Sequence, residues 1–178
     1  MSVTRAQTTI ECVVGDITRQ DDADAVVNAA NAQLMPGGGV AGAIHRVAGP
    51  GLAEECAPLA PIRPGEAVLT GGHGLPNPHV IHCLGPVYGH DEPADRFLAD
   101  CYRNALRLAD DHQLGTVAFP ALSTGAFGYP MAAAADVAMS TLCELAAGLH
   151  HVRCIRMVLT DERVREIHER ALAEACGS

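Results

Sequence analysis

Residues 28–49, NAANAQLMPGGGVAGAIHRVAG, decide the architecture, because a strand end, a glycine-rich loop and a helix follow one another here. The apolar residues 25–27 just before this stretch are typical of a buried strand. Residues 40–48 are apolar and rich in alanine, so they predict a helix that begins directly after Gly37, Gly38 and Gly39. Glycine N–H groups at a helix N-terminus attract an anion. The stretch therefore predicts a phosphate or diphosphate site.

Three other interpretations of this loop are weaker. Gly37, Gly39 and Gly42 match the dinucleotide-binding pattern G-x-G-x-x-G, but nine residues separate them from Val27, and no acidic residue stands near Ala60. The nucleotide-binding loop of the Walker type needs a lysine, and none follows these glycines. A flexible surface loop is the third alternative, which the preceding asparagines and the following amphipathic helix disfavour.

Composition favours one α/β domain over residues 1–178. Hydrophobic residues make up 48% of the chain and charged residues 19%, which is typical of an enzyme-like domain and not of a disordered chain. The formal net charge of −9 argues against broad binding to a nucleic-acid backbone, which clustered cations provide. Backbone amides must therefore hold an anionic ligand.

The cysteines and histidines predict no metal site, and we expect no cofactor. Seven cysteines without a C-x-x-C pair predict reduced, mostly buried thiols. His79 and His82 flank a strand-like run and His150 and His151 are adjacent, so neither pair has the i, i+4 spacing of a helical zinc site. The N-terminal residues contain no apolar segment, and no apolar run reaches about 18 residues, so we expect a cytoplasmic protein.

The remaining chain alternates between strand and helix patterns. Strands are expected at residues 10–14, 67–70, 80–84, 116–120 and 154–159, the second and third as a hairpin-like pair. Helices are expected at residues 50–56, 94–113, 130–147 and 162–175, with Pro130 at the first helical position. This order predicts a three-layer α/β/α sandwich with a mixed central sheet. Ligands in such sheets bind at the carboxyl ends of strands.

Two residues after strands have alternative interpretations. Asp16 is either a turn and cap residue or an acceptor for the exocyclic amine of a base. Ser123 stands in A-L-S-T-G, close to a nucleophile elbow, and Asp136 or Asp161 and then His168 follow in hydrolase order. The glycine that opens that motif is missing. The alternative is that residues 123–125 present hydroxyls and amides to a phosphate, while Phe127 stacks on a sugar or packs as a lid.

Four motifs together resemble those of the macrodomains, the ADP-ribose-binding modules. They are G-D-I-T at residues 15–18, V-N-A-A-N at 27–31, G-G-G-V-x-G-A-I-H at 37–45 and S-T-G-x-F-G at 123–128. Each motif alone is weak, but four in this order are specific. The resemblance covers residues 10–172 and is closest to the branch that removes ADP-ribose from proteins and deacetylates O-acetyl-ADP-ribose.

The resemblance implies a role for each matching position. Asp16 would bind the adenine amine beside the Ile17 amide, Asn31 would bind the distal ribose, and His45 would lie near it. The other implied ligand-binding residues are Gly38, Gly39 and Val40 at the distal ribose and diphosphate, and Ser123, Thr124, Gly125, Ala126 and Phe127 over the diphosphate. The implied catalytic set is Asn31, His45, Gly39, Gly125 and Phe127. The expected partners are ADP-ribose or ADP-ribosylated proteins, and neither a membrane nor a nucleic-acid backbone.

Ala41 departs from the resembled branch, whose hydrolases carry aspartate in G-G-G-V-D-G. The resemblance implies that this carboxylate positions or activates the attacking water, and a positioned general base contributes roughly 10²- to 10⁴-fold. Two hypotheses follow. The protein is a hydrolase whose water is held by a substrate phosphate oxygen and the amides of Gly39 or Gly125, or it is a non-catalytic reader of ADP-ribose.

Overall fold

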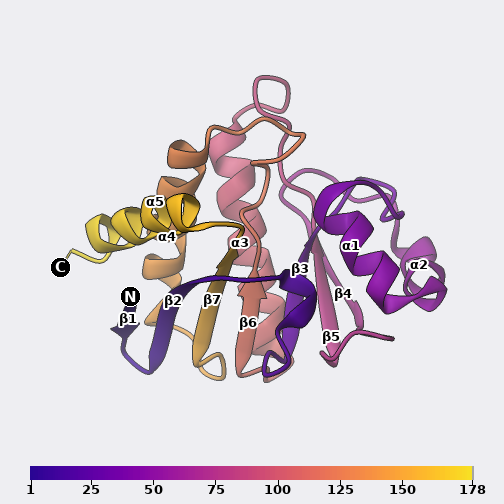
Figure 1. Cartoon of the computed structure of the whole chain (residues 1–178), viewed down its shortest axis with the longest axis horizontal. Coiled ribbons are helices and arrows are strands. Elements are labelled where there is room, and N and C mark those ends of the chain that lie inside the picture. The colour runs from indigo at the N-terminus through magenta and orange to yellow at the C-terminus, as the bar shows by residue number, and fades with distance from the viewer. Residues whose placement is uncertain (178) are drawn as a thin grey trace.

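The computed structural model describes residues 1–177 and folds them around one seven-stranded sheet (Figure 1). The strand order is β1-β2-β7-β6-β3-β5-β4. The edge strands β1 (Ser2–Arg5) and β4 (Ala67–Gly71) each pair antiparallel with their neighbour. The remaining strands are parallel: β2 (Thr8–Val14), β7 (Cys154–Leu159), β6 (Thr116–Phe119), β3 (Ala25–Ala29) and β5 (His79–Cys83). The predicted mixed sheet is confirmed.

Helices cover both faces of this sheet, which makes the three predicted layers. The α3 (Ala94–Asp111), α4 (Met131–Ala146) and α5 (Glu162–Ala175) helices share one core cluster with β-strand residues such as Val27. The opposite cluster contains Val26 together with residues of α1 (Gly39–Ala48) and α2 (Pro50–Cys56). Val26 and Val27 belong to different clusters because successive strand residues point to opposite faces. Figure 1 shows α1 and α2 on the right and α4 and α5 on the left of the sheet.

Several strand and helix ends are shifted by one or two residues from the expected ranges, and three further differences concern β1, α3 and the start of α4. The β1 strand was not predicted, since its four residues SVTR carry little apolar signal. The α3 helix ends at Asp111 and not at Gln113, because Gln113 adopts a positive φ of 59°. Pro130 is the N-cap of α4, one position earlier than predicted. Two short 3₁₀ helices, Ile17–Arg19 and Ala57–Leu59, complete the elements.

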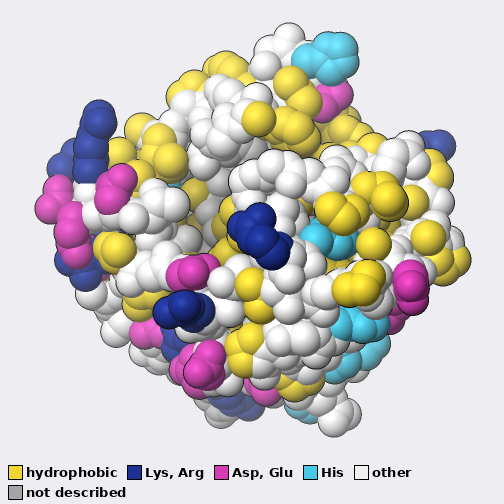
Figure 2. Space-filling view, turned by 45° about the vertical axis from the view of Figure 1, so that its right-hand side comes forward, with side chains coloured by type: hydrophobic (Ala, Val, Ile, Leu, Met, Phe, Trp, Pro, Cys, Tyr) yellow, Lys and Arg dark blue, Asp and Glu magenta, His cyan; other side chains and the backbone are white. Residues whose placement is uncertain are grey.

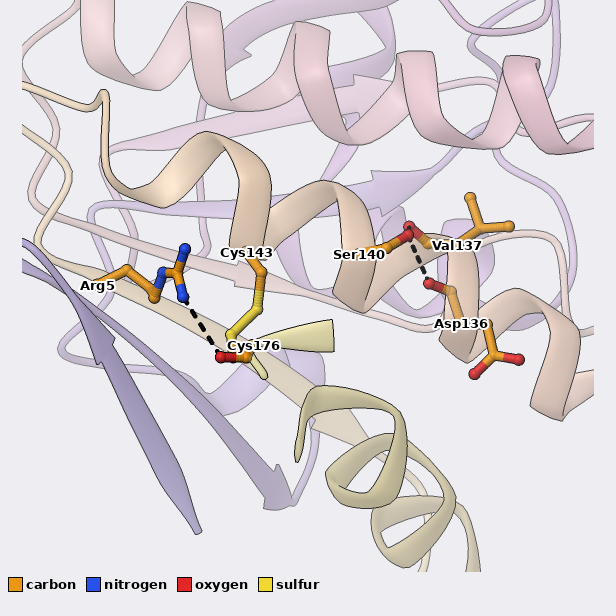
Figure 3. The surroundings of a disulfide bond; sticks show 6 residues. All are labelled: Arg5, Asp136, Val137, Ser140, Cys143 and Cys176. Atoms are coloured by element: carbon orange, nitrogen blue, oxygen red, sulfur yellow. Dashed lines mark hydrogen bonds between the residues drawn. A yellow bond between two sulfur atoms is a disulfide. The ribbon is translucent and has the colours of Figure 1, made fainter. Parts of the chain in front are cut away.

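The prediction that all cysteines are reduced thiols was wrong for two of them. Cys143 in α4 and Cys176 after α5 form a disulfide with their Cα atoms 5.8 Å apart (Figure 3). The packing of α5 against α4 brings the C-terminal ends of the two helices together, so that these positions meet although 33 residues separate them in the sequence. Arg5 donates a hydrogen bond to the Cys176 carbonyl oxygen, which ties the end of β1 to the same corner.

Four of the free thiols are buried: Cys12, Cys56, Cys83 and Cys101. Cys154 is half-buried. Across residues 1–177, no helix is long and apolar enough to cross a membrane.

Candidate active site

A cavity of about 790 Å³ opens where β2, β3, β6 and β7 end. Its lining comes from the four segments that leave these strands, at residues 15–17, 29–31, 120–127 and 158–160, and from the glycine loop and α1. All eleven ligand-binding residues that the sequence predicted lie here: Asp16, Ile17, Asn31, Gly38, Gly39, Val40, Ser123, Thr124, Gly125, Ala126 and Phe127. The carboxyl-end position is the one expected for a ligand site in an α/β sheet.

The glycine loop gives the cavity its first set of free amides. Gly38 is the N-cap of α1, and Gly39 has a positive φ of 57°. A Cβ atom on Gly42 would collide with the Gly37 carbonyl oxygen, so this position in the first turn needs glycine. No acceptor in residues 1–177 pairs with the backbone N–H groups of Gly37, Gly38 and Gly39. These N–H groups and the positive end of the helix dipole favour an anion.

The second loop gives a matching set from the other side. The Ser123 carbonyl oxygen accepts from the Tyr129 N–H at 2.9 Å, and the Gly128 N–H donates to Gly125 at 3.0 Å, so the loop is closed on itself. Within the described chain, the N–H groups of residues 125–127 have no backbone acceptor. Two loops that approach one cavity with free amides can hold a dianionic group such as a diphosphate.

The hydroxyl groups of this loop are not placed to bind a phosphate, although the sequence had predicted that they would. Thr124 Oγ1 donates to the Ala121 carbonyl oxygen at 2.7 Å. Ser123 has a positive φ of 67°, and its buried Oγ packs against Gly85, where even a Cβ atom would not fit. The amides of the loop, and not these two hydroxyls, are therefore the groups available to a ligand.

The serine-hydrolase alternative finds no catalytic geometry. Ser123 Oγ has no hydrogen-bond partner among residues 1–177. His168 Nδ1 instead lies 2.9 Å from the Val164 carbonyl oxygen within α5, and Asp161 caps that helix through the Val164 N–H. A nucleophilic serine needs a base within hydrogen-bonding reach, so the predicted order Ser123, Asp161, His168 is not a triad.

Asp16 is both a cap and a cavity residue. Its Oδ1 accepts from the Thr18 N–H at 2.9 Å and from the Thr18 hydroxyl at 2.7 Å. These hydrogen bonds lower the pKa of Asp16, with the hydroxyl bond as the largest cause, so the carboxylate stays ionised at neutral pH. Its Oδ2 has no partner within the described residues and is free to accept a hydrogen bond. The two interpretations of Asp16 are thus compatible.

Asn31 begins the loop between β3 and the glycines. Its Nδ2 donates to the Met35 carbonyl oxygen at 2.8 Å, and its Oδ1 accepts from the Met35 N–H at 3.0 Å. A carboxamide can donate twice and accept twice, so one hydrogen and one lone pair remain for a ligand in the cavity. Asn31 therefore fixes the loop and lines the site.

His45 was expected beside the ligand, but it is not among the residues that line the cavity. It stands one helical turn below Ala41, is 6% exposed, and neither ring nitrogen has a hydrogen-bond partner in residues 1–177. Burial lowers its pKa, which keeps the ring neutral. Ala43 is the last residue of α1 that lines the cavity, and the His45 ring is buried beneath it without reaching the lining.

Below His45 lies a buried polar cluster that the sequence did not predict. Asn28 Nδ2 donates to His82 Nδ1 at 3.0 Å, and His82 Nε2 lies 2.9 Å from Thr70 Oγ1. Thr70 Oγ1 in turn donates to the Gly71 carbonyl oxygen, so the chain of bonds assigns the ring proton to Nε2. His82 is fully buried, and burial lowers its pKa to about 4.

The cavity contains little acidic charge of its own. Asp16 is the only carboxylate among its lining residues within the described chain. Ala41, 4% exposed, presents a methyl group in the first turn of α1. On the face that Figure 2 shows, acidic and basic side chains are interspersed among wide hydrophobic and uncharged areas. The net negative charge is thus not concentrated in one patch there.

Comparisons with known proteins agree with this geometry. A family model described as "Macro domain" matches residues 27–138. An Enterobacter protein named O-acetyl-ADP-ribose deacetylase is 45% identical over 170 residues, which cover 93% of this chain and 94% of that protein.

Two solved structures have the same fold. The Oceanobacillus iheyensis macrodomain with ADP superposes with a TM-score of 0.93 at 37% identity, over 98% of this chain and 95% of that one. A Trypanosoma brucei macrodomain in complex with ADP-ribose gives 0.83 at 37% identity, over 92% of this chain and 68% of that one. Fold, sequence motifs and relatives all agree: the chain belongs to the macro domain family.

Proposed function

We propose that the protein binds ADP-ribose in this cavity and hydrolyses its esters. The substrates would be proteins with mono-ADP-ribose on acidic side chains, O-acetyl-ADP-ribose, or both. The observation that carries the proposal is the pair of loops, residues 37–39 and 125–127, which line one cavity beside Asn31 and whose backbone N–H groups pair with no acceptor among residues 1–177.

The order of the strands supports the ligand assignment. Asp16 follows β2 and Asn31 follows β3, and β7 and β6 lie between these two strands. Three strand spacings place the two residues roughly 14 Å apart across the sheet. The amide-rich loop after β6 lies between them. This sequence of groups suits a ligand with a base at one end, a diphosphate in the middle and a ribose at the other end.

The chemistry would rely on placement. For an acidic side chain linked at the anomeric carbon of the distal ribose, a water molecule attacks that carbon, its bond to the ester oxygen breaks, and the side-chain carboxylate leaves with the electron pair. For an acetyl group on a ribose hydroxyl, the water attacks the acetyl carbonyl carbon, and the bond to the ribose oxygen breaks to give acetate and the free hydroxyl. Because Ala41 supplies no carboxylate, the water proton passes to a phosphate oxygen of the substrate or to solvent. The backbone amides of Gly39 or Gly125, together with the unused hydrogen-bond donor and acceptor of the Asn31 side chain, would hold the reacting groups in place.

A non-catalytic ADP-ribose reader is the second candidate, and Ala41 favours it. Within residues 1–177, no carboxylate lines the cavity apart from Asp16, which belongs to the opposite end. A site that lacks a general base can bind its ligand fully and still turn over slowly.

Two measurements on the same protein distinguish the candidates. Calorimetry with ADP-ribose measures binding, and chromatography of O-acetyl-ADP-ribose measures conversion to ADP-ribose and acetate. The hydrolase predicts saturable binding together with conversion above the uncatalysed rate. Binding without conversion, also with a glutamate-linked substrate, would support the reader, and absence of binding would reject both.

A further inference from the structure

A partly buried chain of hydrogen bonds connects the Asp16 turn to an ionic cluster on the sheet. Arg156 of β7 stands opposite Glu11 of β2 and is 13% exposed. Its Nε donates to Glu11 Oε1 at 2.8 Å, and its two terminal nitrogens donate to the two oxygens of Asp22 at 2.7 and 2.9 Å. One terminal nitrogen also donates to Gln20 Oε1 at 3.2 Å.

The Gln20 side chain connects this ionic cluster to the turn that contains Asp16. It is 8% exposed, and its Nε2 donates to the Asp16 carbonyl oxygen at 2.9 Å. Its backbone is held as well, since Asn77 Nδ2 donates to the Gln20 carbonyl oxygen at 2.6 Å. A Cβ atom on Gly15 would stand 3.3 Å from Gln20 Nε2, so the side chain lies directly under the turn.

The chemistry of the partners leaves Gln20 one orientation. A guanidinium has donors and no acceptor, so the Gln20 oxygen must face Arg156. A carbonyl oxygen has no donor, so the Gln20 NH₂ must face Asp16. Rotation of the amide by half a turn would lose both bonds in a buried place, where an unpaired polar group is costly. We call this connection, from Arg156 through the Gln20 side chain to the Asp16 carbonyl oxygen, the Gln20 bridge.

We propose that Gln20 and Arg156 are positioning residues for recognition of the base. The Gln20 bridge fixes the backbone of Asp16, Thr18 fixes Oδ1, and together they direct the free Oδ2 toward the exocyclic amine of adenine. The proposal rests on the proposed function, because it requires that the cavity takes ADP-ribose. It assigns selectivity for an amine-bearing base to residues that do not line the cavity.

A matched pair of ligands isolates this role. Inosine diphosphate ribose keeps both riboses and the diphosphate but replaces the exocyclic amine by a carbonyl oxygen, which cannot donate to Asp16. The ratio of the two dissociation constants therefore reports the placement of Oδ2. A hydrogen bond to a charged group predicts that the wild type prefers ADP-ribose about tenfold or more.

The test variant is Gln20→Glu. A glutamate keeps the oxygen that Arg156 requires but cannot donate to the Asp16 carbonyl oxygen. The preference for ADP-ribose is expected to fall from about tenfold to below about threefold, while affinity for inosine diphosphate ribose changes less than about twofold. Arg156→Lys, which keeps the charge and loses the two-pronged geometry, is expected to act in the same direction and serves if Gln20→Glu does not fold.

Two further variants separate positioning from a general structural effect. Arg103→Gln removes an arginine of another ion pair, with Asp100 on α3, and is expected to leave the ratio unchanged. In an Asp16→Ala background, Gln20→Glu is expected to change the ratio no further, because both act through one carboxylate.

The possible results distinguish the proposed function from the role of the Gln20 bridge. Wild type that binds neither ligand overturns the proposed function and this inference together. Wild type that binds both equally overturns the inference alone, and so do a Gln20→Glu and an Arg156→Lys protein that keep the wild-type ratio.

Discussion

Asn31 and Met35 are joined by two hydrogen bonds of opposite direction, so the asparagine side chain pairs with both backbone groups of the methionine. The pair closes a turn at residues 31–35, within the connection between β3 and the glycine loop. Asn31 therefore has two roles in the site. It holds the loop in place, and its remaining Nδ2 hydrogen and Oδ1 lone pair can bind a ligand.

Asn31→Ala is expected to lower turnover more than it lowers ADP-ribose affinity. Loss of two neutral hydrogen bonds allows the loop to move, and the groups that must meet the transition state lose their placement. We expect about tenfold or more in turnover and less than about threefold in affinity. Single-turnover kinetics and calorimetry measure the two quantities. Equal losses in both would assign Asn31 to binding alone.

Asp16→Ala is expected to weaken ADP-ribose binding about tenfold or more, since a hydrogen bond to an ionised group is lost. Loss of the cap on Thr18 costs little of the fold. Asp110→Ala is the matched control, because its carboxylate also accepts loop N–H groups, those of residues 150–152, at the amino end of β7. If the control loses as much affinity, Asp16 acts through stability only.

The fold is expected to lose stability in mild acid through His82. Its pKa is lowered from 6.5 to about 4, so the folded state favours the neutral ring. The neutral His82 ring therefore contributes about 3 kcal/mol to the free energy of unfolding above pH 6.5. This contribution declines as the pH falls toward 4. The neighbouring His45, whose pKa is also lowered, adds in the same direction.

Urea unfolding at pH 7.0, 6.0 and 5.0 measures this loss. His82→Gln is expected to flatten the decline, whereas His90→Gln, at an exposed position, is expected to leave it unchanged. An unfolding free energy independent of pH across this window in the wild type would contradict the assignment.

Reduction of the Cys143–Cys176 disulfide is expected to lower the free energy of unfolding by about 3 to 4 kcal/mol, because the 33-residue separation sets the loop that the bond closes. Urea unfolding with and without a reductant gives the difference. Cys154→Ser should retain the full effect, and Cys143→Ser should abolish it. Coincident transitions in the wild type would show that the bond does not form in solution.

Sequence patterns predicted the elements that carry a strong period. The strand 154–159 and the helices 50–56 and 162–175 have the expected bounds, because apolar residues recur there at regular spacing. The β1 strand escaped because an edge strand of four residues, half of them polar hydroxyl residues, buries too little to leave a pattern.

The site was predictable where it is made of backbone. The glycine loop and the S-T-G loop could be recognised from their composition, and the structure brings both to one cavity. Contacts between distant segments were not predictable. The Cys143–Cys176 pair, the Asn28–His82 bond and the Gln20 bridge each join residues whose sequence separation exceeds any local period. The helix period places His45 on the same face as Ala41, but it does not tell how deep the cavity reaches.

Ala41→Asp is expected to weaken ADP-ribose binding without a gain in turnover. The new carboxylate would stand in the first turn of α1, close to the predicted diphosphate position, and like charges in a partly dry site repel. Calorimetry and single-turnover hydrolysis of mutant and wild type measure both effects. A rise in rate of roughly two orders of magnitude, the size of a restored general base, would show that the wild-type site is a weakened form of an aspartate-dependent one.

Ester hydrolysis without a carboxylate at position 41 is the central claim, and single-turnover release of ADP-ribose from a glutamate-linked protein tests it most directly. With enzyme in excess over substrate, the wild type is expected to release ADP-ribose in one exponential phase, faster than the uncatalysed reaction, and Asn31→Ala is expected to slow that phase. Wild-type protein that binds ADP-ribose in calorimetry but releases none above the uncatalysed rate would contradict the claim and identify the protein as a reader.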